Sequence, residues 1–166
     1  MAKYAQLITL QDNSNGFIKA VELLTKQKVL VGVPSTTAGR SGGKNVNAIN
    51  NAQIGYIHEF GAPAANIPAR PHLVPGVESI KPEMIRLLRL AGNRALSGDT
   101  SAATQALNQV GLMAQSAVRR KISLGPFVPL AEATIKARQR RGVTRINPLM
   151  DTGKYRQSIT YVIRII

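Results

Sequence analysis

Cysteine and tryptophan are both absent from this chain, and aromatic residues make up only 4% of its 166 residues. The lack of cysteine excludes disulfide bonds and thiolate metal ligands. Because aromatic rings are so few, a core has to be built from leucine, isoleucine, valine and alanine. No apolar run approaches the roughly 20 residues that span a bilayer. We therefore expect no membrane partner and a protein that is made in a cytoplasm.

Acidic residues are the second shortage. Eight Asp and Glu stand against 22 Lys and Arg, which gives a net charge of +14. Such an excess attracts polyanions, but it fits a nucleic acid, an acidic protein partner or a solvated surface equally well. No two carboxylates occur at a spacing typical of an acid–base pair or a Mg²⁺ site. We therefore expect a protein that is not an enzyme and that holds no metal or other cofactor.

Histidine is the third scarce residue type, since the chain contains only His58 and His72. His58 and Glu59 adjoin one another, as two residues of a zinc-protease helix do. That pattern also needs a histidine four residues after the first, and this chain has Ala62 there. A lone histidine is weak evidence for a site, so we expect His58 to pack or to form a hydrogen bond at a helix end.

The patterning predicts an α+β fold: a small, mostly antiparallel sheet packed under long α-helices, in a single domain over residues 1–166. Apolar spacing of three and four residues predicts the helices, and alternation or a short β-branched run predicts the strands. The expected helices are 14–27, 47–60, 82–98, 99–122, 130–141 and a short step at 154–157, and the expected strands are 29–33 and 158–166. The first of these strands has the character of a buried central strand.

Two segments are expected to protrude from this domain. Residues 35–46 form a polar, glycine-rich loop. Residues 61–75 begin at Gly61, a typical helix C-cap, and contain four prolines, each of which bars the preceding residue from helical geometry. This second segment predicts a stiff, extended arm that presents Arg70, framed by Pro68 and Pro71, to a neighbouring molecule.

A basic segment follows the longest predicted helix and extends through a helix and loop at 130–147. Cations near a helix C-terminus favour the helix dipole, and a run of charge is commonly a solvated face. The alternative is a surface that contacts the phosphates of DNA without reading its sequence, because the segment lacks aromatic residues for stacking. The candidate DNA-facing cations are Arg119, Arg120, Lys121, Lys136, Arg138, Arg140, Arg141 and Arg145.

Four blocks of the sequence together resemble the tail-completion or neck proteins of long-tailed bacteriophages. They are VLVGVP at 29–34, NAQIGYIHEFG at 51–61, IPARPHL at 67–73 and PLMDTGKYRQSITY at 148–161. Each block alone is a weak signal, and their order and spacing make the combination more specific. The resemblance covers most of the chain from residue 29 onward.

This resemblance implies a structural protein of the virion, assembled in the cytoplasm of the bacterial host. Copies of the chain would form a ring, most commonly a hexamer, at the head–tail junction. The ring would join head-closure or stopper proteins to the tail terminator or tube, with the viral DNA passing through it without sequence-specific contacts. The alternative function is a free nucleic-acid-binding protein that uses the basic segment 119–145. The candidate assembly residues are Tyr56, His58, Glu59, Phe60, Ile67, Pro68, Arg70, Pro71, Leu73, Asp151, Thr152 and Tyr155.

Overall fold

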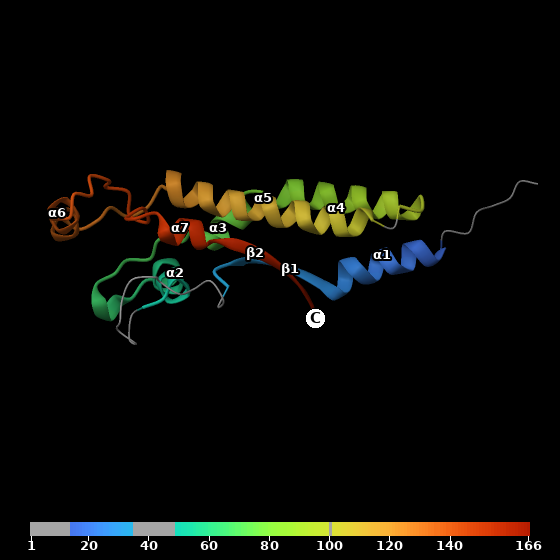
Figure 1. The fold of residues 1–166 in the computed structure, drawn as a ribbon, viewed down its shortest axis with the longest axis horizontal. Coiled ribbons are helices and arrows are strands. Elements are labelled where there is room, and N and C mark those ends of the chain that lie inside the picture. The colour runs from blue at the N-terminus through green and yellow to red at the C-terminus, as the bar shows by residue number, and fades with distance from the viewer. Residues whose placement is uncertain (1–13, 35–48, 100) are drawn as a thin grey trace, which may run out of the picture.

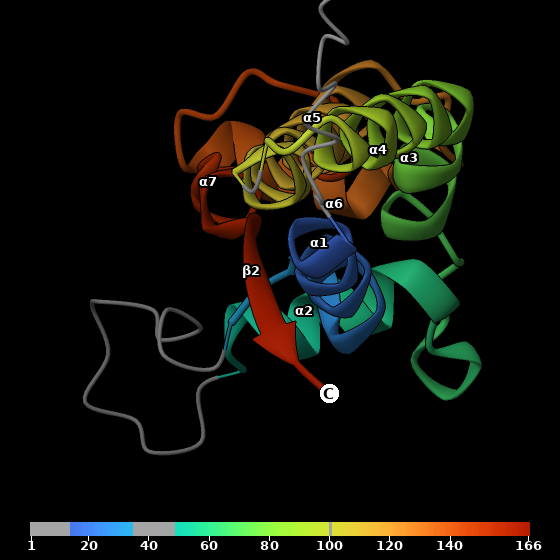
Figure 2. The same ribbon diagram turned by 90° about the vertical axis from the view of Figure 1, so that its right-hand side faces the viewer.

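The computed structural model describes residues 14–34, 49–99 and 101–166. These residues form an elongated α+β structure in which the long helices make one layer and a small sheet with two further helices makes the other (Figure 1; Figure 2). The upper layer consists of α3 (Leu73–Glu78), α4 (Lys81–Leu96) and α5 (Ala102–Leu124). The lower layer consists of α1 (Ser14–Lys26), β1 (Gln27–Gly32), α2 (Asn51–Phe60) and β2 (Thr160–Ile165). Two short helices, α6 (Glu132–Arg140) and α7 (Lys154–Ser158), complete the order.

Helix α5 is the element on which the other elements pack. Small residues recur along it at helical spacing, and Ala103, Ala106 and Ala114 are all buried. Small side chains let neighbouring backbones approach closely, so the first half of α5 contacts α4 and α1 through alanines. The second half carries Val118 and Ile122, which form the largest core cluster together with side chains from the C-terminal segment. The core is therefore aliphatic, as the shortage of aromatic residues predicts.

The sheet consists of two antiparallel strands, with Val29 opposite Ile163 and Val31 opposite Tyr161. It packs against α5, so the predicted arrangement of a small antiparallel sheet under long helices is confirmed. The predicted burial of the first strand is wrong. Leu30 is 48% exposed, because a strand in a two-stranded sheet has one face against the helix and the other open.

Helix α2 has a cap at each end that the sequence encodes. The Asn50 side chain accepts a hydrogen bond from the Gln53 N–H, and the Gln53 side chain accepts one from the Asn50 N–H, both at 2.9 Å. At the other end, Gly61 adopts a φ of 80° and donates its N–H to the Ile57 carbonyl. That φ lies in the region which favours glycine. The predicted end of this helix is confirmed, and its predicted start at 47 is too early, because Asn50 caps a helix that begins at Asn51.

The segment 61–75 does not form an extended arm throughout. Its tip folds into a short 3-10 turn at Pro63–Ala65, closed by a bridge between Ala62 and Ile67. The chain then returns to the body of the molecule and starts α3 at Leu73, inside the stretch predicted to be extended. Pro75 is tolerated because it lies in the first turn of that helix, where its missing N–H has no partner to lose.

The remaining helices start and end within a few residues of their predicted positions, and α5 runs to Leu124 where an end at 122 was predicted. The predicted loop 35–46 lies outside the described residues. Within the described part of the chain, no helix offers an apolar stretch of the length that a bilayer demands.

Candidate functional site

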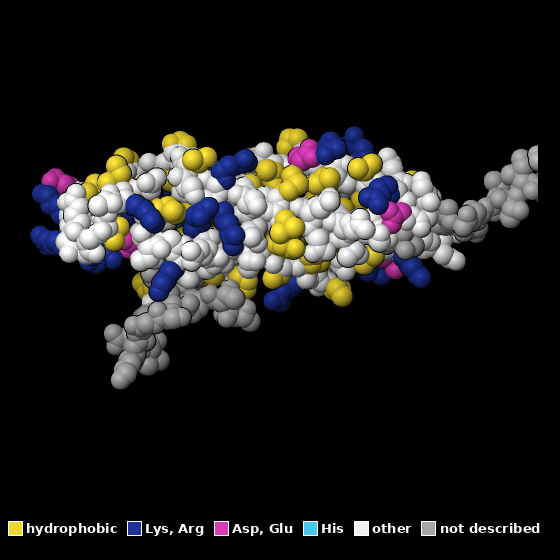
Figure 3. Space-filling view, turned by 45° about the horizontal axis from the view of Figure 1, so that its top comes forward, with side chains coloured by type: hydrophobic (Ala, Val, Ile, Leu, Met, Phe, Trp, Pro, Cys, Tyr) yellow, Lys and Arg dark blue, Asp and Glu magenta, His cyan; other side chains and the backbone are white. Residues whose placement is uncertain are grey.

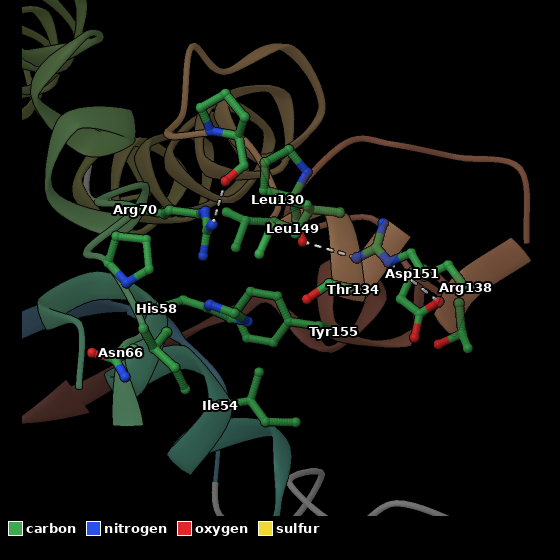
Figure 4. A pocket seen from close by; sticks show the side chains of 17 residues that line it. Ile54, His58, Asn66, Arg70, Leu130, Thr134, Arg138, Leu149, Asp151 and Tyr155 are labelled. Atoms are coloured by element: carbon green, nitrogen blue, oxygen red, sulfur yellow. Dashed lines mark hydrogen bonds and ion pairs between the residues drawn. The ribbon is translucent and has the colours of Figure 1, made fainter. Parts of the chain in front are cut away.

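Four segments that are distant in sequence meet around one pocket of about 530 Å³ (Figure 4). Helix α2 contributes Ile54 and His58, and the returning proline segment contributes Arg70. The other walls come from residues 129–138, which include the start of α6, and from residues 148–155. Three of the four sequence blocks singled out above therefore converge on this pocket, together with a segment that the sequence analysis treated only as a basic surface.

Glu59 lies behind the pocket and holds the returning segment in place. Its buried carboxylate accepts hydrogen bonds from the backbone N–H groups of His72, Leu73 and Val74, at 2.8, 2.9 and 3.1 Å. Burial raises the pKa of the Glu59 carboxyl, but these three hydrogen bonds together hold it below its usual value. The structure gives Glu59 this internal role in place of the predicted contact with a neighbouring subunit.

His72 and Tyr155 form a buried pair at the floor of the pocket. The Nε2 atom of His72 lies 2.5 Å from the Tyr155 hydroxyl, and Nδ1 lies 2.9 Å from the Arg70 carbonyl. Burial lowers the pKa of His72 and raises the pKa of Tyr155, so both side chains are neutral near pH 7. The predicted assembly residue Tyr155 is therefore a core residue, and its ring edge reaches the pocket.

Arg70 lies inside the fold, with only 5% of its surface exposed. Its Nε donates to the Val128 carbonyl at 2.8 Å and its Nη2 to the Pro129 carbonyl at 2.9 Å. Burial lowers the pKa of this guanidinium, and the nearby charge of Arg138 lowers it further. The prediction that Arg70 reaches out to a neighbour is corrected, because the segment that carries it folds back and uses it to hold residues 128–129.

His58 faces the same pocket from α2. Its Nδ1 atom is buried and has no hydrogen-bond partner among the described residues. Burial lowers its pKa to about 4, and the neighbouring His72, Arg70 and Arg138 contribute to the shift. Of the two alternatives expected for His58, the structure shows packing: the imidazole lies edge-on against Tyr155, with 6.2 Å between ring centroids.

Arg138 is the second buried cation, 4% exposed, and it organises the loop after α6. Its guanidinium donates to the carbonyls of Arg145, Asn147 and Pro148 at 2.9–3.1 Å. Asp151 lies 3.8 Å from its Nε. The prediction that Arg138 faces DNA is corrected, because all of these contacts are internal.

Arg119 also departs from the predicted basic surface. It donates to the carbonyls of Gln157 and Ile159 at the end of α7, at 2.7–3.1 Å. The other predicted cations remain at the surface, with Lys121 half-buried over the Phe127 ring, 5.7 Å from its centroid. Figure 3 shows one face on which such cations are interspersed with hydrophobic side chains. Ion pairs join Lys136 to Glu132 and Arg141 to Asp151.

The remaining predicted assembly residues divide between the surface and the pocket. Tyr56 and Phe60 project from α2 with 67% and 64% of their surface exposed, and their ring centroids lie 4.8 Å apart. Pro71 is exposed, and Leu73 is partly buried against the core. Among these remaining predicted assembly residues, those that line the pocket are Ile67, Pro68, Asp151 and Thr152.

Over residues 14–34, 49–99 and 101–166, no three His, Asp or Glu side chains gather at a spacing that holds a metal ion. Thr134 and Leu130 line the pocket as well, and the sequence analysis missed both. No local pattern shows that the start of α6 faces α2, since this depends on the path of the intervening loop.

Comparison with known proteins leaves the chain without an assigned relative. The resemblance to phage neck proteins therefore rests on the four sequence blocks and stays a prediction. No protein-family model, no curated protein and no solved structure matches the chain.

Proposed function

We propose that this chain is a structural subunit of the neck of a long-tailed bacteriophage, where copies assemble into a ring between head-closure proteins and the tail. The observation that carries the proposal is the incomplete sheet: two strands whose outer edges, and much of whose apolar surface, have no partner among the described residues. An incomplete sheet of this kind is completed by a neighbouring chain in many assemblies.

The hydrogen-bond pattern of the sheet leaves both outer edges open. The Ile166 N–H donates to the Lys26 carbonyl at 2.9 Å. Because antiparallel pairs alternate between bonded and non-bonded, the N–H and C=O groups of Val29 and Val31 point outward from β1. The same groups of Tyr161 and Ile163 point outward from β2, and no other described backbone group bonds to either edge. These outward N–H and C=O groups can form hydrogen bonds with a strand from another molecule.

Exposed apolar side chains lie in the same layer as these edges, on α1, on β1 and at the end of β2. The lower layer carries five large aliphatic side chains that are at least 38% exposed, and Ile165, at 79%, is the most exposed of them. They are Ile18, Val21, Leu30, Ile165 and Ile166. Clustered exposed apolar surface marks interaction sites in soluble proteins, which supports an assembly role for this layer.

The second candidate function is binding of nucleic acid without sequence preference. Its support is a set of exposed cations with no ion pair among the described residues, namely Arg120, Arg140 and Arg145. Four of the eight cations predicted to serve that role are in ion pairs or internal contacts, namely Arg119, Lys136, Arg138 and Arg141. The basic surface is therefore smaller than the sequence indicates, and we rank this function second.

Inactivation of the gene in the phage that encodes the chain tests the proposal. Without the chain, we expect electron micrographs of lysates to show filled heads and complete tails that are not joined. Supplying the chain in trans should restore joined, infectious particles. Joined particles in the absence of the chain would contradict the proposal and favour the second candidate, which predicts no defect in joining.

A further inference from the structure

We infer that the pocket between α2, α6 and residues 148–155 is a socket for an acidic side chain of a protein partner, presented on an extended apolar segment. This inference does not depend on the ring, since it concerns a site within one copy of the chain. It rests on unused hydrogen-bond donors, on charge and on the shape of the pocket.

Arg70 supplies the first unused donor. Two of its guanidinium nitrogens are held by the Val128 and Pro129 carbonyls, and Nη1 has no hydrogen-bond partner among the described residues. The guanidinium projects into the pocket toward His58 (Figure 4). Because its other two nitrogens are fixed, Nη1 is already oriented, and little side-chain entropy is lost when a ligand binds.

His58 supplies the second unused group, across the pocket from Arg70. Its buried Nδ1 has no partner within the described residues, and a buried polar atom without a partner is unfavourable. A neutral imidazole carries a donor on one nitrogen, so Nδ1–H can bond to an anion beside Arg70. Nothing in the ring has to become charged for this contact to form.

The charge of the pocket favours an anion. Arg70 and Arg138 are both buried in its wall, and Asp151 is its one acidic lining residue. Asp151 is shared between Arg138 and Arg141, at 3.8 and 3.2 Å. The site therefore has a surplus of one buried cation, Arg70, because Asp151 offsets the charge of Arg138.

The size and walls of the pocket favour a peptide over a phosphate of DNA. Its volume of about 530 Å³ falls within the range of roughly 300–1,000 Å³ of ligand pockets. Ile54, Ile67, Leu130 and Leu149 make its walls apolar, whereas the DNA backbone is contacted through exposed cations and polar groups. An aspartate or glutamate flanked by apolar residues matches both the walls and the donors.

Nuclear magnetic resonance titration of the full chain tests the socket with the blocked tripeptide acetyl-Leu-Asp-Leu-amide. We expect saturable shifts of the His58 ring and Arg70 guanidinium signals. The matched acetyl-Leu-Asn-Leu-amide should bind at least tenfold more weakly, since a charge-assisted hydrogen bond is about twice as strong as a neutral one. Inorganic phosphate is titrated in parallel.

Two variants on α6 serve as a matched pair. Thr134→Trp places a large ring at the pocket, and Gln139→Trp places the same ring on the exposed surface outside it. We expect Thr134→Trp to weaken tripeptide binding at least tenfold and Gln139→Trp to change it less than twofold. The socket is refuted if the aspartyl and asparaginyl peptides bind alike, if phosphate binds more tightly than the aspartyl peptide, or if Thr134→Trp binds as the wild type does.

Discussion

His58 illustrates how the residues around the pocket determine its chemistry. Its side chain lies near His72, Arg70 and Arg138 and packs against the Tyr155 ring, and burial lowers its pKa to about 4. In the unfolded chain the same imidazole has a pKa near 6.5. Between these two values the unfolded chain binds a proton that the folded chain does not, so the free energy of unfolding falls as the pH drops.

The size of this effect follows from the shift. One pKa unit corresponds to about 1.4 kcal/mol, and solvent access to the ring screens part of it, so we expect about 1–2 kcal/mol from His58 between pH 6.5 and 4. Urea unfolding at a series of pH values, with wild type and His58→Phe compared, measures it. The lowered pKa values of His72 and Glu59 act in both proteins and cancel in the comparison. Identical pH profiles, or a His58 titration near 6.5 by nuclear magnetic resonance, would contradict this account.

At the scale of elements, the contact between α5 and β2 leaves no room for an added side-chain atom at Gly111. A Cβ atom added to Gly111 would lie 2.2 Å from Cδ2 of Tyr161. The Tyr161 hydroxyl donates a hydrogen bond to the Asn108 side-chain carbonyl, one turn earlier on α5, at 3.0 Å. This hydrogen bond and the backbone of β2 together hold the ring over Gly111. The sheet therefore depends on a glycine at this position to lie close to the helix.

Gly111→Ala should lower the free energy of unfolding by about 1–3 kcal/mol, as overpacking does. Gly92→Ala, in α4, is the matched control, because no atom lies within 4 Å of its added Cβ. There we expect a gain of about 0.5–1 kcal/mol from helix propensity. Thermal or urea unfolding of both variants measures the difference, and equal stabilisation at the two positions would refute the packing of Tyr161 on α5.

At the same scale, the sequence predicts elements whose signals are local. The alternation at 159–165 predicts β2, and Gly61 predicts the end of α2, whereas the start of α2 at Asn51 lies four residues after the predicted one. The sequence does not predict α3, because the cap of that helix is the Glu59 carboxylate, which belongs to a different helix. The sequence does not predict the internal roles of Arg70, Arg119 and Arg138 either, because each guanidinium donates to carbonyls whose positions depend on the tertiary fold.

The candidate site follows the same division. The sequence identifies the blocks around His58, Arg70 and Asp151, since their prolines, glycines and polar residues are unusual. It does not show that they share a pocket, and it misplaces Arg70 on the surface because two flanking prolines indicate a stiff segment without indicating its direction. Convergence of distant segments is a property of the chain path, which no local pattern specifies.

As a whole, the molecule is elongated, built along α5, and incomplete on one side. Its largest core cluster lies between the two layers, and its lower layer ends in a two-stranded sheet with open edges and exposed isoleucines. The free edge of β2 is the stronger candidate for contact with a neighbour, because Ile165, its most exposed side chain, lies at its end. We therefore propose that copies of this chain join through the sheet layer at the head–tail junction.

A cryo-electron microscopy reconstruction of the neck of virions that encode this chain tests that claim most directly. We predict a closed ring of this fold around the DNA, in which the outer edge of β2 or the apolar side chains beside it contact the adjacent subunit. A neck that lacks the chain, or a ring whose subunits leave the sheet layer exposed to solvent, would contradict the account.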